Sequence, residues 1–235
     1  MKKYKLTTET LQFAGRTLHR IKAVKDFDSI KAGEFGGWIE NEKNLSQDDN
    51  AWIYGNAMVF DNAEVYDNAK VYGNANVSGN ANVSGNAKVY GIANVFGNAN
   101  VFGNAEVYGN ANVFGNAEVY DNAKVYGNAN VSGNAEVYGN ANVSDYAKVY
   151  GNAVIKGDAK VHDAVGYIVF KNFWSSGRYF TWTSSNNKWS VGCFYGTGEE
   201  LIKKAYADSE KSGREYERVV RYVESILADE KKEKK

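Results

Sequence analysis

Residues 99–128 read ANVFGN AEVYGN ANVFGN AEVYDN AKVYGN, which is five consecutive copies of one six-residue pattern. The pattern, A-x-V-[Y/F/S]-[G/D]-N in most copies, runs from residue 51 to residue 164 as nineteen units without an insertion. Alanine holds the first place of every unit, and valine or isoleucine holds the third. A period this short and this strict is typical of a solenoid.

The chemistry of one unit predicts the shape of the coil. Residues two apart on a strand point to the same side, so the alanine and the valine face inward while the second and fourth residues face outward. The Gly-Asn or Asp-Asn pair tolerates left-handed backbone conformations and makes a corner. Three corners close a triangle of 18 residues, and successive coils stack about 4.8 Å apart. Corner asparagines are expected to form hydrogen-bonded ladders. The predicted fold is mainly β, a triangular parallel β-helix.

The repeat resembles the left-handed hexapeptide β-helix family, and the handedness is implied by that resemblance alone. Residues from about 20 to 164 are similar to phage and bacterial hexapeptide-repeat proteins described as putative transferases, most specifically in GGW at 36–38 and LSQ at 45–47. Many members of the family are trimeric acyltransferases. The resemblance implies a fold and a phage or prophage setting, but not a reaction.

The first 50 residues break the six-residue rhythm and are expected to cap the solenoid, because an uncovered end exposes a strand edge. Ile39 and Leu45 are six apart and Ile53 follows after eight, which predicts an irregular first coil with two extra residues. Tyr4–Thr8 and Thr17–Val24 have the composition of short strands.

The segment after the repeat is expected to form a small α+β unit. Strands are predicted at Tyr167–Phe173, Arg178–Thr183 and Lys188–Tyr195, followed by two helices. Thr197 with Glu200, and Ser212 with Glu215, have the spacing of capping boxes and so predict the two helix starts. The expected domains are an N-terminal cap with the irregular coil (1–50), the hexapeptide β-helix (51–164) and a three-strand, two-helix unit (165–235).

Composition limits the partners and the compartment. Lys+Arg and Asp+Glu both number 28, so there is no basic excess to favour nucleic acid or an acidic membrane. No stretch approaches the roughly 20 apolar residues of a membrane span. Cys193 is the single cysteine, which fits a reducing compartment. We therefore expect a cytoplasmic protein of a bacterium or a phage-infected host that binds neither membrane nor nucleic acid.

Catalytic chemistry has few candidate residues. A hexapeptide acyltransferase needs a general-base histidine beside a groove between subunits, yet the chain has only His19 in the cap and His162 in the last repeat. One cysteine and two distant histidines do not supply a zinc site. We expect no catalytic residue, metal or cofactor.

Sorting the units by threes separates three outward faces, because every third unit shares a side. The first face is basic and lined by tyrosine, the second is neutral, and the third is acidic and aromatic. We predict that the first and third faces meet in a trimer, through Lys70, Tyr72, Lys88, Tyr90, Tyr108, Lys124 and Tyr126 on the first and Glu64, Phe102, Glu118, Tyr120, Glu136 and Tyr138 on the third. The aromatic residues have a second interpretation, in which they stabilise the solenoid by stacking coil upon coil.

Aromatic residues also gather in the C-terminal unit, around one arginine. Such a group could hold a base, a sugar or a peptide, or could serve as the core of a small domain. The candidate binding residues are Trp174, Arg178, Tyr179, Trp182 and Trp189.

These features predict a non-catalytic, self-associating binding or scaffold protein, and the resemblance implies that it is phage-encoded. It would engage a host protein or a small ligand through the C-terminal unit or through grooves between subunits. The alternative is a hexapeptide acyltransferase that uses acetyl-CoA.

Overall fold

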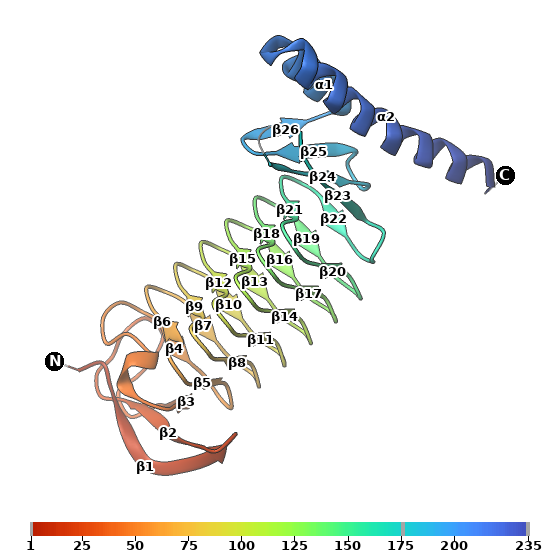
Figure 1. Ribbon diagram of the computed structural model, residues 1–235. Helices are drawn as coiled ribbons and strands as arrows, with labels where there is room; N and C mark the ends of the chain where they lie inside the picture. Colours follow the sequence, from red (N-terminus) through yellow and green to blue (C-terminus); the bar gives the residue numbers. More distant parts are fainter. Residues whose placement is uncertain (1, 175–176, 234–235) are drawn as a thin grey trace. The chain divides into compact units, whose positions relative to one another are not determined.

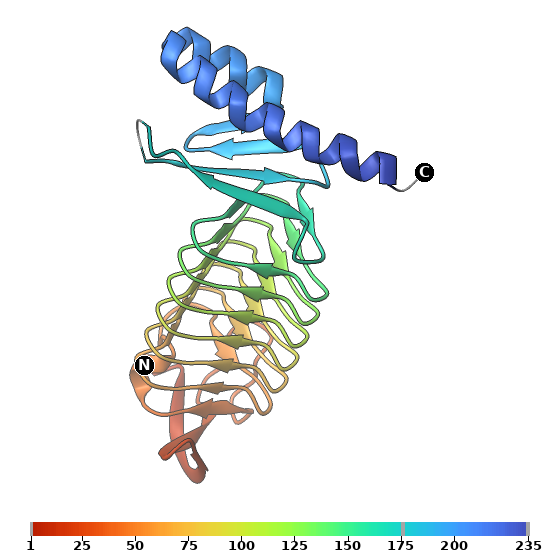
Figure 2. The same ribbon diagram turned by 45° about the vertical axis from the view of Figure 1, so that its right-hand side comes forward.

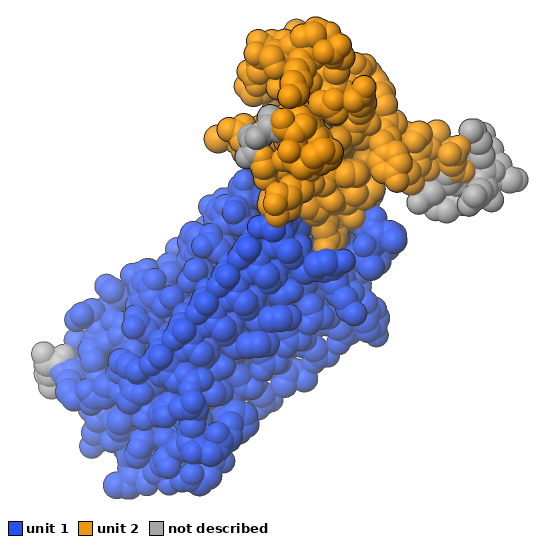
Figure 3. Space-filling view, in the orientation of Figure 1, with its two compact units in different colours: residues 1–166 blue, residues 167–235 orange. Residues whose placement is uncertain are grey.

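The computed structural model describes residues 2–174 and 177–233, with side chains as far as residue 229. The chain divides into two compact units, residues 1–166 and 167–235 (Figure 3). Unit 1 holds the N-terminal cap and the whole repeat, and unit 2 holds an antiparallel sheet with two helices.

The cap begins with three antiparallel strands, β1 (Tyr4–Phe13), β2 (Arg16–Ala23) and β3 (Phe35–Ile39). Strand β1 extends beyond the expected Tyr4–Thr8, whereas β2 begins and ends one residue before the expected Thr17–Val24. A tight turn at Ala14 and Gly15, both at positive φ, joins the two strands. Strand β3 also pairs in parallel with β5 (Met58–Val59), so the cap sheet continues directly into one wall of the solenoid.

The irregular first coil is confirmed, because Ile39 pairs with Val59, twenty residues on, whereas later partners are eighteen apart. The 3-10 helix η1 (Glu42–Asn44) and the bridge between Leu45 and Val65 complete this coil. Its extra residues surround the buried Lys3, whose Nζ donates to the carbonyl oxygens of Asp48 and Ala51. Burial lowers the pKa of the Lys3 amine to about 8.

The repeat forms nineteen two-residue strands in three parallel walls, as the hexapeptide pattern predicts (Figure 1). Face 1 is the wall of β4 (Trp52–Ile53), β7 (Lys70–Val71), β10 (Lys88–Val89), β13 (Glu106–Val107), β16 (Lys124–Val125), β19 (Asn142–Val143) and β22 (Lys160–Val161). Face 2 is the wall of β5, β8 (Asn76–Val77), β11 (Asn94–Val95), β14 (Asn112–Val113), β17 (Asn130–Val131) and β20 (Lys148–Val149). Face 3 is the wall of β6 (Glu64–Val65), β9 (Asn82–Val83), β12 (Asn100–Val101), β15 (Glu118–Val119), β18 (Glu136–Val137) and β21 (Val154–Ile155).

The interior is a column of alanine and valine or isoleucine, each at most 1% exposed. Backbone hydrogen bonds join each coil to the next, as where Asn100 N donates to Ala117 O at 2.9 Å and Phe102 N donates to Val119 O at 3.0 Å. The alternation of inward and outward positions in the sequence is therefore confirmed.

The corners carry the left-handed residues that the pattern predicts. From Gly55 to Gly157 the fifth place has positive φ whether it is glycine or aspartate, for example 76° at Gly97 and 61° at Asp61. The Asp61 carboxylate accepts a hydrogen bond from the Gly79 amide of the next coil at 3.0 Å. The predicted asparagine ladders are present, as where Asn98 Nδ2 donates to Asn116 Oδ1 at 2.9 Å.

Unit 2 contains a four-stranded antiparallel sheet of β23 (Tyr167–Lys171), β24 (Tyr179–Thr183), β25 (Lys188–Val191) and β26 (Phe194–Gly196), whereas three strands were expected (Figure 2). The expected third strand is divided because Gly192, at φ 54°, turns the chain back as a hairpin.

Two helices follow the sheet, α1 (Gly198–Asp208) and α2 (Glu210–Glu233). The capping box of Thr197 and Glu200 is confirmed at the start of α1. The second predicted box is wrong, because α2 begins before Ser212. Instead, the Ser209 hydroxyl accepts the Ser212 amide hydrogen at 3.1 Å. Ser209 therefore has the capping position at the start of α2 that was predicted for Ser212.

Close approach of the coils predicts a graded cost for alanine at the corners. A Cβ on Gly97 would lie 2.9 Å from Gly115 N, whereas a Cβ on Gly151, at nearly the same φ, meets nothing within 4 Å. We expect Gly151→Ala to lower the free energy of unfolding by about 1–2 kcal/mol, the usual cost of a left-handed residue with a Cβ. Gly97→Ala should cost at least about 1 kcal/mol more.

Urea unfolding followed by far-ultraviolet circular dichroism measures both variants. Equal losses at the two glycines would show that backbone conformation alone, and not the contact between coils, sets the requirement for glycine.

Candidate functional site

The outward aromatic residues stack along the solenoid axis within one chain. On face 1, the Tyr72 and Tyr90 rings lie 4.8 Å apart with an angle of 4° between their planes, and the stack continues through Tyr108 to Tyr126. Equivalent stacks are Phe96–Phe114 beside face 2 and Phe102–Tyr120–Tyr138 beside face 3. The ring spacing equals the spacing of the coils, so each ring covers part of its neighbour.

Stacking leaves the tyrosine hydroxyls half-buried beside carboxylates. Burial raises the pKa of Tyr90, and the nearby Glu106, whose Oε2 lies 3.3 Å from the hydroxyl, raises it further. Burial and Glu136 act in the same way on the pKa of Tyr120. Both hydroxyls therefore stay neutral near neutral pH, and the aromatic columns carry no charge of their own.

The lysines of face 1 have partners within the chain. Lys70 Nζ lies 2.6 Å from Asp28 Oδ2 and also donates to Asn50 O at 2.8 Å. Lys88 and Lys124 approach opposite oxygens of Glu106, at 3.6 Å and 3.7 Å. The basic character of face 1 is therefore partly neutralised by Glu106 and by Asp28, and the Asp28 contact was not predicted.

The carboxylates of face 3 differ from the lysines of face 1 in their contacts. Across the residues with described side chains, Glu64, Glu118 and Glu136 form no ion pair. Glu64 is exposed, and the other two are half-buried beside the aromatic column.

A groove of about 360 Å³ lies at the cap end of the face 1 stack, lined by Tyr54, Lys70, Tyr72 and Lys88. The Tyr54 ring stands edge-on to Tyr72, at 85° and 6.3 Å, so the parallel stack ends there. Three of the predicted interface residues, Lys70, Tyr72 and Lys88, thus border this groove together with Tyr54.

The two histidines occupy structural positions. His19 Nδ1 lies 3.4 Å from Thr7 O in the cap sheet. His162 Nδ1 lies 2.6 Å from Ser144 Oγ and 3.3 Å from Asp145 Oδ2, and Ser144 is buried. Both neighbours meet the same ring nitrogen, so the three side chains lack the relay geometry of a catalytic triad, which uses both nitrogens.

The five aromatic and basic residues singled out in unit 2 do not form one surface. Trp182 and Trp189 are each 2% exposed and pair across β24 and β25 in the core against α1 and α2. Trp174 is half-buried and packs against that core, at 6.1 Å from Phe180. The remaining members lie toward solvent, with Arg178 exposed and Tyr179 half-buried.

The described residues contain no group of three or more His, Cys, Asp or Glu side chains that could hold a metal ion. Among those residues, no helix is both long enough and apolar enough to cross a membrane.

Comparison with known proteins gives a partial match. No family model matches the chain. It is 39% identical over 62 residues to a protein of Escherichia coli (strain K12) described as "Uncharacterized acetyltransferase YdcK". The matched part makes up 23% of this chain and 19% of that relative, so the chain spans about a fifth of its length.

The fold is therefore defined by three features together. The six-residue unit recurs without a break, three units close each coil, and partners eighteen residues apart pair in parallel along every wall. The chain is a hexapeptide-repeat protein of the left-handed parallel β-helix type, with a small antiparallel sheet and two helices at its C-terminal end.

Proposed function

We propose that this protein is a rigid, non-catalytic binding scaffold that assembles as a trimer. The observation that carries the proposal is the unbroken repeat with two unlike outward walls. Face 1 presents a lysine column, whereas the glutamates of face 3 form no ion pair with any described side chain. No loop leaves the coils between residues 51 and 164. A solenoid without loops offers little room for a catalytic pocket, but its walls offer a large area for contacts with a partner.

Unlike walls favour a heterologous contact, in which face 1 of one subunit meets face 3 of the next. The walls of a triangular prism are related by about 120°, so such a ring closes at three subunits. The tyrosine column beside Lys88 and Lys124 would then lie against the column that contains Tyr120. Their flat, half-buried rings supply apolar area, while the charges set orientation and register.

Charge reversal on face 3 tests the trimer without breaking an ion pair of the monomer. We expect Glu118→Lys with Glu136→Lys to weaken assembly by about 1–2 kcal/mol per contact, because exposed pairs contribute about 0–1 kcal/mol each. Adding Lys88→Glu and Lys124→Glu should restore part of the loss. Multi-angle light scattering over a dilution series measures the assembly.

A wild-type monomer at micromolar concentration contradicts the trimer. A trimer that is unaffected by the reversals contradicts the choice of walls but leaves self-association standing. Circular dichroism of each variant separates loosened assembly from loss of the fold.

Acetyl transfer is the second candidate, favoured by the partial similarity to the E. coli protein described as an acetyltransferase. The residues present do not fit that activity. Neither His19 nor His162 lines the groove beside Tyr54 or the hollow at Lys5 in the cap, and His162 is engaged by buried Ser144.

The acetyltransferase alternative predicts a measurable thiol product. We expect the protein, incubated with acetyl-CoA and a panel of amines and alcohols, to release free CoA no faster than the buffer control. Release that disappears in His162→Ala and persists in His19→Gln would overturn the non-catalytic proposal.

We place partner binding by unit 2 at its solvent-facing residues, Arg178 and Tyr179. The uniform repeat offers many equivalent positions, whereas this end of the sheet is irregular and therefore unique along the chain. Arg178→Ala should abolish capture of a host partner at unchanged melting temperature. If the Arg178→Ala variant still captures the partner and the Trp182→Phe variant does not, partner binding depends on the core of unit 2 and not on this surface.

A phage-encoded protein in the bacterial cytoplasm fits the rest of the proposal. The resemblance implies the phage or bacterial setting, and Cys193 is a free, exposed thiol, which a reducing compartment protects.

A further inference from the structure

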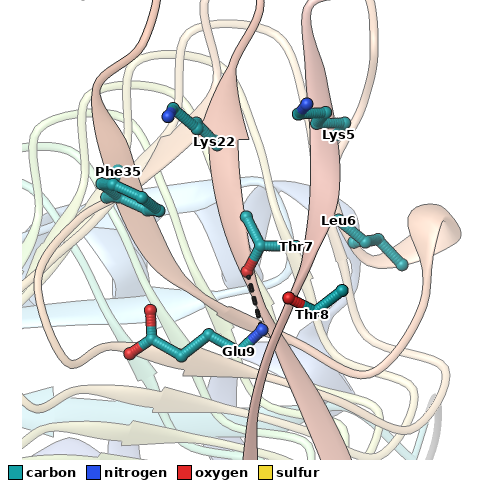
Figure 4. Close-up of a pocket in the computed structure, with 7 residues that line it drawn as sticks. All are labelled: Lys5, Leu6, Thr7, Thr8, Glu9, Lys22 and Phe35. Carbon is teal, nitrogen blue, oxygen red and sulfur yellow. Dashed lines mark hydrogen bonds between the residues drawn. The ribbon is translucent and has the colours of Figure 1, made fainter.

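A hollow of about 470 Å³ lies on the cap sheet, well separated in sequence from the repeat walls (Figure 4). Strands β1, β2 and β3 all contribute to it, so its floor is a regular sheet and its lining is held in place by backbone pairing. The residues that line it are Lys5, Leu6, Thr7, Thr8, Glu9, Lys22 and Phe35.

Two lysines lie side by side on adjacent strands of this sheet without an acidic partner among the described residues. Lys5 and Lys22 are paired directly in the register of β1 and β2, where Cβ atoms of opposed residues lie about 4.5–5.5 Å apart. Within the described part of the chain, neither amine forms an ion pair. Like charges directly opposite destabilise a sheet, so folding alone does not explain this arrangement.

Edge protection explains only one of the two lysines. Strand β1 is the outer strand of its sheet, and a lysine on an outer strand discourages unwanted pairing with another chain. Lys22 lies on β2, an inner strand between β1 and β3, where that role does not exist. The presence of both lysines in the lining of one hollow therefore needs another reason.

An exposed aromatic ring completes the lining. Phe35 pairs with Lys22 in register and leaves 52% of its surface exposed, although it is a large apolar residue. The Lys22 amine lies 4.7 Å from the ring centre, and the Arg20 guanidinium lies 5.5 Å from it. These cations hold the ring at the rim of the hollow and do not cover it.

The remaining polar groups leave the hollow positive. The register of β1 shifts between Leu6 and Thr10, and Thr7 Oγ1 accepts the Glu9 amide hydrogen at 3.3 Å (Figure 4). The Glu9 carboxylate, the only acid in the lining, is paired with Arg20 at 3.3 Å. The two lysine charges are thus unopposed at the centre, with the hydroxyls of Thr7 and Thr8 as nearby hydrogen-bond donors.

We propose that this hollow binds a small aromatic anion, specifically a phosphate monoester attached to an aromatic group. The phosphate would lie between the amines of Lys5 and Lys22, where its double negative charge removes their repulsion. The aromatic group would pack on the exposed surface of Phe35. The inference does not depend on the trimer, because it uses no residue of the repeat walls.

Calorimetric titration of the full chain with adenosine 5′-monophosphate tests the site. We expect a dissociation constant below about 1 mM, with adenosine and inorganic phosphate each binding at least about fivefold more weakly. Lys5→Gln and Lys22→Gln should each weaken binding about threefold to fivefold, as for partly exposed charge pairs. Phe35→Leu should weaken the nucleotide but not inorganic phosphate, because only the aromatic contact is lost.

Lys203→Gln is the matched control, since it removes one exposed lysine charge from α1, in unit 2. It should leave binding unchanged. Absence of nucleotide binding at 5 mM (about the limit of weak specific binding), or equal losses in the control and the two hollow variants, would overturn the proposal. Equal affinity for inorganic phosphate and the nucleotide would overturn the aromatic part, and with it the proposed ligand class.

The melting temperature without ligand gives a second, independent measurement. Removing one of two repelling charges should raise it by about 1–3 °C in Lys22→Gln, while Lys203→Gln should not change it. A variant that loses nucleotide binding and gains stability cannot have lost binding by unfolding. A lower melting temperature in both Lys5→Gln and Lys22→Gln would contradict the unopposed lysine pair on which the site rests.

Discussion

The structure depends on the parallel hydrogen bonding of each coil to the next at a fixed offset of eighteen residues. Because the offset does not change from Trp52 to Val161, every outward position stands directly above its counterpart in the previous coil. Side chains that suit a stack are therefore repeated, and the asparagine ladders and parallel tyrosine rings follow from one register. The same register would also place repeated lysines directly above one another, where they would repel. Glu106 interrupts the column between Lys88 and Lys124 and contacts both.

The cap covers the exposed strand edge at the N-terminal end of the solenoid. Strand β3 has an antiparallel partner on one side and a parallel partner on the other, so it covers the first edge of face 2. Glycines at 36 and 37 allow it to lie close, since a Cβ at either place would fall within 2.6 Å of the first regular coil. The buried Lys3 lies beside the irregular first coil, with its amine bound to the carbonyl oxygens of Asp48 and Ala51. A cap of this kind must deviate from the repeat. Lys5 and Lys22, the lysines without an acidic partner, lie in this part of the chain.

Periodicity made the solenoid predictable, while contacts distant in sequence remained unpredictable. Spacing in the sequence predicts the inward alanines, the corners, the three walls and the irregular first coil. It does so because the number of residues between two equivalent positions decides which strands pair in this fold. The partnership of Lys70 with Asp28 depends on how a cap loop folds over face 1, and no local pattern encodes that. In unit 2 the aromatic alternation predicted the first two strands to within two residues at each end, but Trp182 and Trp189 proved to be core residues. The hairpin at Gly192 was missed because a single glycine within an apolar run does not distinguish a turn from a continuous strand.

A perfectly periodic wall cannot define a unique contact, because sliding a partner by one coil of about 4.8 Å would recreate nearly every interaction. Register must therefore come from positions where the columns change. Face 1 changes at Glu106, and face 3 changes between the asparagines at 82 and 100 and the glutamates at 118 and 136. A one-coil slip would set some like charges against each other and leave other charges without partners. In the proposed trimer, the irregular residues on the two walls would therefore select one register among many that the repeat alone makes nearly equal in free energy.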